Sequence, residues 1–308
     1  MATTLTVSSN YAGKEAGEII GKAFKEADTI NKNFVTVLPD IDHQVSIRKI
    51  SYTDGRTDYV CGFTPQGSVT LSEVTLAPKK LKNELEICKE DLRQIWSSAT
   101  MGFSAHNDSI PNDVETALLA EIMADSAEAT DLDIWQGPAS TSGRFEGLIT
   151  KWGSDSDIIK AGNGITSASA AITSSNVLAE LAKVVAAIPV SLRRKSLKFG
   201  ISPDVADAYS QLLISNGSAN GLGGNANTSL VYGRYTLEVL NGLPDNTFVV
   251  AEAKNLYFGT GLMSDHNEIR IKDMDKSDLS GQVRYKEVFT AGVQYVNPEE
   301  IVWYLSTT

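Results

Sequence analysis

Few residues of the chain stand at the spacings that catalysis requires. Residues 102–106, Gly-Phe-Ser-Ala-His, resemble the turn that presents a nucleophilic serine, but His106 stands where the last glycine is needed. The other two histidines are His43 and His266, and no two of the three have the spacing of metal ligands. We therefore expect surface or hydrogen-bonded histidines and assign no catalytic residue.

Two other stretches come close to ligand-binding motifs and fail at a required position. Residues 17–22 are one residue short of a phosphate-binding loop, and Ala23 replaces the serine or threonine that would hold magnesium. Asp273 and Asp275 match the start of a calcium loop, but Asp278 replaces its glycine and Arg284 its final glutamate. Neither stretch predicts a cofactor or metal site.

An acidic stripe is the remaining candidate for ion binding. Glu121, Asp125, Glu128 and Asp131 recur every three or four residues, so they share one face of a predicted helix. A cation site is one interpretation. The other is a solvated or subunit-facing helix side, which we favour because runs of charge usually face solvent. No metal ligand is therefore assigned.

The charge and cysteine content exclude several classes of protein. The net charge is −11, and the longest run of adjacent basic residues is Arg193, Arg194 and Lys195, whereas nucleic-acid binding needs a clustered basic surface. No apolar run reaches the ~20 residues that span a membrane. Cys61 and Cys88 are too few for a disulfide framework.

The elements that would position these residues follow an α+β pattern. Apolar residues at helical spacing predict a long helix over 111–135, ended by Gly137 and Pro138, and a second over 176–188. A third helix opens at Ser202 and closes at Asn216 and Gly217. A long loop of small residues, 215–229, follows. The last third is mostly strand, over 235–240, 247–251, 255–258, 268–272, 282–289 and 301–305.

A hairpin-like region precedes the helices. Residues 45–52 and 69–76 read as strands, with turn residues at 53–56 and a returning segment at 59–63. The region has few large apolar side chains with which to build a core, and an isolated hairpin is only marginally stable in water. We expect it to pack on something else, such as a neighbouring subunit.

The C-terminal third carries a resemblance to a known family. The segments are 255–265 (NLYFGTGLMSD), 268–271 (EIRI), 282–285 (QVRY), 289–294 (FTAGVQ) and 300–304 (EIVWY), with 145–149 (FEGLI), 202–205 (SPDV) and 243–245 (LPD) upstream. In this order they resemble the major capsid proteins of tailed bacteriophages that have the Hong Kong ninety-seven-type fold.

The resemblance implies an architecture. Residues 1–44 would be the N-terminal arm and 45–75 the extended loop. Residues 76–152 and 262–308 would form the peripheral domain with its long spine helix, and 153–261 the axial domain. The function implied is a non-enzymatic major capsid protein that self-assembles into the pentamers and hexamers of an icosahedral head enclosing double-stranded DNA.

Three parts of this architecture are candidates for subunit contact. They are the hairpin turn, the acidic helix face and the loop of small residues. Their residues are Asp54, Gly55, Arg56, Glu121, Asp125, Glu128, Asn216, Gly217, Gly223 and Gly224.

The resemblance also implies partners. Some relatives carry a long N-terminal scaffolding segment, and we expect none in this chain. Either a separate scaffolding protein acts or the segment has already been removed, and Met1 favours the separate scaffold. We also expect a portal, assembly in the host cytoplasm, a place in the virion and no membrane contact. DNA would be enclosed without sequence-specific binding. No lysine lies between Ile50 and Lys79, so we expect no lysine cross-link in the extended loop, although some relatives form one.

Two alternatives remain open. An encapsulin, a cellular compartment with the same fold, would enclose enzyme cargo instead of a genome. A soluble α+β hydrolase would use scattered carboxylates and would show a deep pocket lined by perturbed acids.

Overall fold

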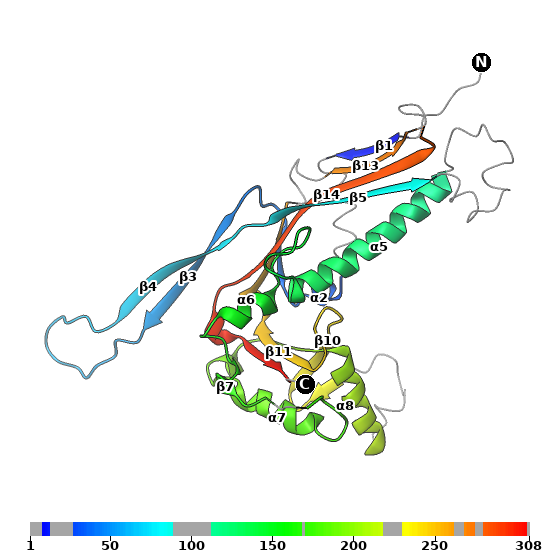
Figure 1. Cartoon of the computed structure of the whole chain (residues 1–308). Helices are drawn as coiled ribbons and strands as arrows, with labels where there is room; N and C mark the ends of the chain where they lie inside the picture. The colour runs from blue at the N-terminus through cyan, green and yellow to red at the C-terminus, as the bar shows by residue number, and fades with distance from the viewer. Residues whose placement is uncertain are drawn as a thin grey trace.

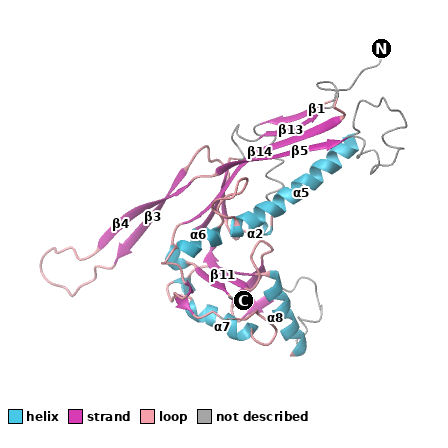
Figure 2. Cartoon of the chain, viewed as in Figure 1, coloured by secondary structure: helices cyan, strands magenta, loops and turns pink. Residues whose placement is uncertain are grey.

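The described part of the chain contains a six-stranded and a five-stranded β-sheet, helices packed against them and a projecting hairpin (Figures 1 and 2). The computed structural model describes residues 8–12, 27–88, 112–167, 170–217, 230–261, 268–274 and 280–306. Within these residues helices and strands mix along the chain, which confirms the α+β prediction.

The larger sheet is organised around one long strand. It has six strands, in the order β1 (Ser8–Ala12), β13 (Glu268–Asp273), β14 (Gln282–Tyr295), β12 (Leu256–Thr260) and β2 (Thr36–Leu38), with β5 (Lys79–Cys88) also paired to β14. The β2–β12 pair is parallel and the other pairs are antiparallel. Strand β5, which is rich in lysine and glutamate, was not predicted from the sequence.

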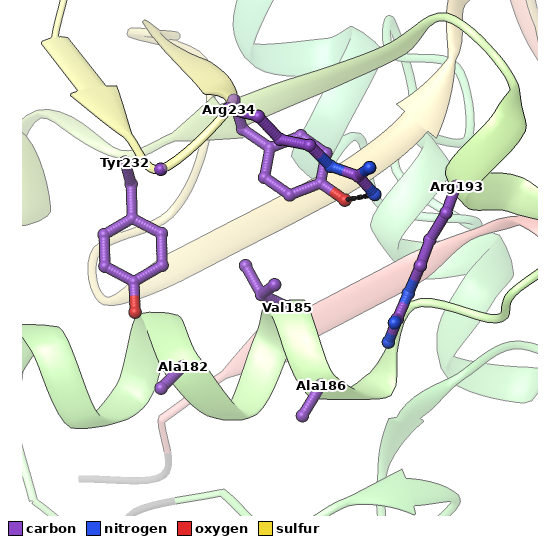
Figure 3. Close-up of a pocket in the computed structure, with 8 residues that line it drawn as sticks. Ala182, Val185, Ala186, Arg193, Tyr232 and Arg234 are labelled. Carbon is purple, nitrogen blue, oxygen red and sulfur yellow. Dashed lines mark hydrogen bonds between the residues drawn. The ribbon is translucent and has the colours of Figure 1, made fainter.

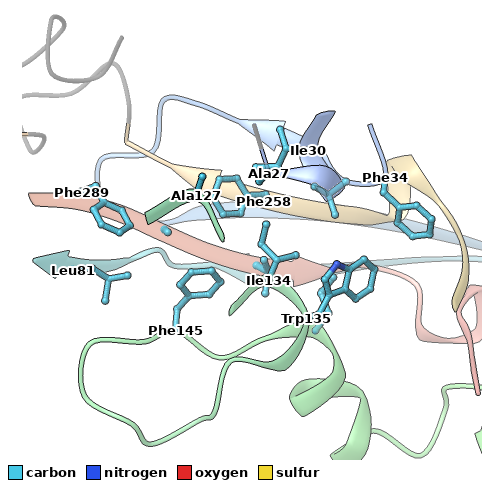
Figure 4. Close-up of a cluster of buried hydrophobic side chains, with 14 of the residues drawn as sticks. Ala27, Ile30, Phe34, Leu81, Ala127, Ile134, Trp135, Phe145, Phe258 and Phe289 are labelled. Atoms are coloured by element: carbon cyan, nitrogen blue, oxygen red, sulfur yellow. The ribbon is translucent and has the colours of Figure 1, made fainter. Parts of the chain in front are cut away.

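A long helix packs along this sheet. Helix α5 (Asn112–Gln136) matches the predicted 111–135 to within one residue. Its inward side chains Ile122, Met123, Ala127, Ile134 and Trp135 join strand residues in the larger hydrophobic core. Figure 4 shows part of this core. The short helices α2 (Asp28–Asn31) and α6 (Leu148–Ser154) contribute Ile30, Leu148 and Trp152.

The smaller sheet has its own core. Its order is β15 (Val302–Leu305), β11 (Thr247–Glu252), β8 (Leu197–Ile201), β10 (Tyr235–Val239) and β9 (Leu230–Tyr232). Helices α7 (Val177–Ala187) and α8 (Pro203–Ser215) pack against it through residues such as Leu181, Val184 and Val205. The short pair β6 (Lys160–Ala161) and β7 (Gly164–Ile165) lies beside it.

The chain crosses between the two sheets at short 3-10 turns. Ala253–Asn255 separates β11 from β12, and Pro298–Glu300 precedes β15. Residues 256–260 therefore belong to the larger sheet and 302–305 to the smaller one, a different division from the predicted boundary at 261/262. The backbone pairing decides this division, and the sequence pattern does not reveal which sheet a strand joins.

Candidate assembly surface

The hairpin of β3 (Val45–Thr53) and β4 (Ser68–Leu76) projects away from both sheets, and most of its residues are exposed (Figure 1). The strands pair antiparallel over all nine residues, from Val45 opposite Leu76 to Thr53 opposite Ser68. The base is anchored to the larger sheet, because Leu76 is buried and Gln294 Nε2 donates to Thr75 O at 3.0 Å.

The distal half of this hairpin displays large apolar side chains. Ile50, Tyr52, Val69 and Leu71 are each more than 60% exposed, at 71%, 66%, 62% and 71%. In the tip loop, residues 54–67, Tyr59, Val60 and Phe63 are exposed as well. Monomers rarely display a large contiguous apolar patch, so this segment is suited to binding another macromolecule.

The tip is longer than the predicted turn. Thr53 still pairs with Ser68, so residues 54–67 form an open loop, and the predicted return strand at 59–63 is wrong. The predicted contact residues Asp54 and Arg56 form an ion pair at its start, with Arg56 Nε donating to Asp54 Oδ2 at 2.6 Å. This hydrogen bond holds the pKa of Asp54 below its ordinary value.

The two ends of the tip loop approach each other so closely at Gly55 and Gly67 that position 55 requires a glycine. A Cβ at Gly55 would lie 2.3 Å from the backbone nitrogen of Gly67, so Gly55→Ala forces the two ends of the loop apart. We expect trypsin to cleave the variant several-fold faster at Arg56, with global stability within about 0.5 kcal/mol of the parent, because the loop lies outside both cores. Thr57→Ala is the matched control. Equal cleavage of Gly55→Ala and the parent would show that this close approach does not constrain the loop.

The four residues of the acidic stripe on α5 differ in burial. Glu121, Asp125 and Glu128 are exposed. Asp131 is buried, and its Oδ1 accepts the backbone N–H of Thr29 at 3.1 Å. Burial raises the pKa of Asp131 despite this bond.

A cavity of about 390 Å³ lies between α2 and α5 and is lined in part by Asp28, Glu128 and Asp131. Asp28 accepts a hydrogen bond from Asn241 and lies 3.5 Å from Lys32 Nζ. Asp28 and Asp131 therefore both contact groups of the chain itself. In the described part of the chain, no group of three acidic, histidine or cysteine residues is arranged to hold a metal ion.

An open groove of about 500 Å³ lies between α7 and the β9–β10 turn (Figure 3). Val185, Tyr232 and Tyr235 give it apolar walls, and Arg193 and Arg234 lie at its sides. Arg234 donates to Tyr235 Oη at 2.7 Å and stacks over that ring, and Arg193 Nε donates to Ile188 O at 3.1 Å. Neither a carboxyl group nor a histidine stands among the lining residues described, so the groove does not match the pocket that a hydrolase would need.

The remaining sequence candidates fall in different places. Asn216 and Gly217 end α8 and are exposed, with Gly217 at a φ of +70°. Gly223 and Gly224 lie outside the described residues, as do 17–22, 102–106, His266, Asp275 and Asp278. His43 is exposed. Residues 54–56, which are adjacent in sequence, lie at the start of the tip loop, whereas α5 packs against the larger core and α8 against the smaller one.

One buried carboxyl group was not predicted from the sequence. Glu287 on β14 is 1% exposed and faces Asn83 of β5, Ser126 of α5 and the hydroxyl of Tyr285, which lies 3.3 Å from Oε2. Burial raises the pKa of Glu287 to about 7. The alternation of β14 places residue 287 on the inward face with Val283 and Tyr285, so the signal was present in the sequence.

The fold is similar to that of solved capsid proteins. A chain of the capsid of the native GTA particle is 12% identical and has a TM-score of 0.61, with 100% of this chain and 96% of that chain covered. The capsid of Myoviridae phage XM1 gives 12% identity, a TM-score of 0.56 and coverage of 91% and 92%. The chain has a phage capsid fold. The procapsid of satellite phage P4, a particle that includes the size determination (Sid) protein, matches at 11% identity, a TM-score of 0.57 and coverage of 94% and 98%.

The solved capsid structures bear out the resemblance seen in the C-terminal third of the sequence. No family model and no curated protein sequence matches the chain. The match spans nearly the full length of both chains, so it includes the two sheets and the hairpin together. No helix in the described part of this capsid-fold chain is long and apolar enough to cross a membrane.

Proposed function

We propose that this chain is the major capsid protein of a tailed phage and self-assembles into the pentamers and hexamers of an icosahedral head around double-stranded DNA. The observation that carries the proposal is a capsid fold combined with a projecting hairpin whose apolar side chains find no partner within the described chain. Each copy both offers a hairpin and accepts one, so the contact is head-to-tail. Such a contact closes into rings when the rotation between successive copies completes a full turn, and it forms open filaments otherwise.

The proposed parts of the subunit follow the two sheets. The larger sheet with α5 would be the peripheral domain and its spine helix, and the smaller sheet with α7 and α8 the axial domain at the centre of each ring. Residues 45–75 would be the extended loop and residues 1–44 the N-terminal arm, of which Phe34 and Val35 are anchored in the larger core. The tip residues 54–56, the exposed α5 face and the end of α8 remain the proposed contacts.

The negative net charge of the chain is suited to a capsid shell that encloses DNA. A net charge of −11 on each subunit, repeated over a shell, would keep the packaged polyanion from adhering to the wall. The proposed partners are further copies of the chain, a separate scaffolding protein and a portal. We place the assembled protein in the virion and its assembly in the host cytoplasm.

Expression of the chain alone tests the proposal. Sedimentation velocity and negative-stain electron microscopy should show rings, tubes or closed shells. Co-expression with the scaffolding protein of the same phage should favour closed shells of uniform size. Particles recovered from infected cells should protect double-stranded DNA from nuclease, whereas protein cargo in place of DNA would favour the encapsulin alternative.

Mature particles should lack covalent cross-links between subunits. The extended loop has no lysine between Ile50 and Lys79, so the amine required for a lysine–asparagine bond is missing from the outer hairpin and its tip. After boiling in denaturant, mature particles are expected to run as one band at the size of a single chain on an electrophoresis gel. A ladder of covalent oligomers would contradict this expectation.

A further inference from the structure

The hairpin changes its apolar face half-way along its length. In an antiparallel pair, directly opposed residues lie on the same face, and successive residues alternate between faces. At the base the apolar rows are Val45/Leu76 and Ile47/Val74. On this face Leu76 is buried and the other three residues are half-buried, because the face packs on the body of its own subunit.

Farther out, the apolar rows stand on the other face. Ile50 opposes Leu71 and Tyr52 opposes Val69, each an odd number of residues from Ile47 or Val74. The first face continues outward as the polar rows Lys49/Ser72, Ser51/Thr70 and Thr53/Ser68. The twist of a two-stranded ribbon turns both faces together, so it does not move a side chain from one face to the other.

We infer that the distal apolar face, Ile50, Tyr52, Val69 and Leu71, docks on a second copy of this chain, and that the Ser51/Thr70 face stays uncovered. The proximal half would rest on its own subunit through one face, and the distal half would hold a neighbour against the opposite face. This inference rests on the proposed function and specifies the geometry of its contact.

Three observations favour a second copy as the occupant. The two sheets of the same subunit cannot cover the distal apolar face. They contact the opposite face of the hairpin at its base, and the hairpin projects away from them (Figure 1). The only charges among the paired rows of this face, Arg48 and Glu73, form an ion pair at 3.3 Å, so the face is neutral. A neutral contact suits two chains that each carry −11 and would otherwise repel.

The area also fits. A stable interface takes about 800 Å² from each partner. The four side chains of this face and the exposed Tyr59, Val60 and Phe63 of the tip provide a large apolar part of such an area.

Two adjacent residues on opposite faces give a matched test. Leu71→Lys and Thr70→Lys each place one new positive charge on the same strand, at exposed positions that leave both cores intact. We expect Leu71→Lys to raise the subunit concentration required for assembly at least tenfold, which corresponds to about 1.4 kcal/mol. Thr70→Lys should assemble like the parent, and Leu71→Met should too. Circular dichroism and urea midpoints of the unassembled subunits should be equal for all four proteins.

The assembly results of the variants show which face of the hairpin docks. If the parent assembles and Leu71→Lys assembles equally well, or if both lysine variants fail equally, the face assignment is wrong while the proposed function stands. If Thr70→Lys alone fails, the opposite face is the docking face. A parent that remains monomeric with and without scaffold overturns the proposed function and this inference together.

Discussion

Replacing Trp135 with alanine is expected to lower the free energy of unfolding of the unassembled subunit by about 4 kcal/mol. Trp135 is fully buried at the end of α5. Its ring meets Phe34 edge-on at 5.6 Å between centroids and Trp152 at 5.9 Å. Its Nε1 donates to Thr29 Oγ1 at 2.7 Å, so the alanine variant loses a hydrogen bond in addition to leaving a cavity.

Urea unfolding followed by circular dichroism measures this loss. Trp135→Phe should recover much of it, because a ring remains between Phe34 and Trp152 and only the indole donor is missing. Phe63→Ala is the exposed-aromatic control, since Phe63 is 95% exposed at the hairpin tip, and it should stay within about 0.5 kcal/mol of the parent. Equal losses in Trp135→Ala and Phe63→Ala would contradict the packing described for α5.

Removing the charge of Glu287 is expected to make the subunit more stable at neutral and alkaline pH. The carboxyl group has an ordinary pKa of 4.5 and a pKa of about 7 in the folded chain, because it is buried between β14, β5 and α5. The folded state therefore keeps a proton that the unfolded state has already lost, so this group's contribution to stability is fully present below pH 4.5. The contribution of Glu287 to the free energy of unfolding falls by about 3 kcal/mol in total as the pH rises from 4.5 to 7. Above pH 7 this contribution is constant.

Glu287→Gln should abolish this part of the pH dependence. Urea unfolding at pH 5, 6, 7 and 8 measures it, with Glu84→Gln as the control, because Glu84 lies on the adjacent strand with its carboxyl group exposed. Asp131 and Asp133 also have pKa values raised by burial, and their contribution has the same sign and is unchanged in the variant. If Glu287→Gln follows the parent at every pH, the buried carboxyl group does not titrate in this range.

Local sequence signals predicted those elements whose stability is set locally. Helix α5 was placed to within one residue because an apolar repeat continues to Trp135 and Gly137 and Pro138 stop the helix. Helix α8 followed from Pro203 at its first turn and Gly217 after its end. The strands after residue 235 followed from alternation, although β14 continues to Tyr295, six residues beyond the prediction.

The elements that were not predicted from the sequence, strand β5 and the full tip loop, depend on pairing between segments that are distant in the sequence. Strand β5 alternates lysine and glutamate with Leu81, Leu85 and Ile87, a composition with weak β-propensity. It becomes a strand because β14 pairs with it along ten residues. The length of the tip loop likewise depends on which residue pairs with Thr53, and turn residues at 53–56 do not determine that.

The candidate site could be predicted in part. The weak core of 45–76 was visible as a shortage of large apolar residues, and this predicted that the segment would need another surface. The change of apolar face required the register, because a shift of one residue in the pairing moves every side chain to the other face. The separation of Asp131 from Glu121, Asp125 and Glu128 required the position of α2, whose Thr29 covers the end of the stripe.

A cryo-electron microscopy reconstruction of particles assembled from this chain tests the central claim most directly. We predict a closed shell of five- and six-membered rings in which each β3–β4 hairpin lies across an adjacent copy. A chain that remains monomeric at high concentration, in crowding agents and with its scaffold, or forms oligomers in which the hairpin touches no other copy, would contradict it.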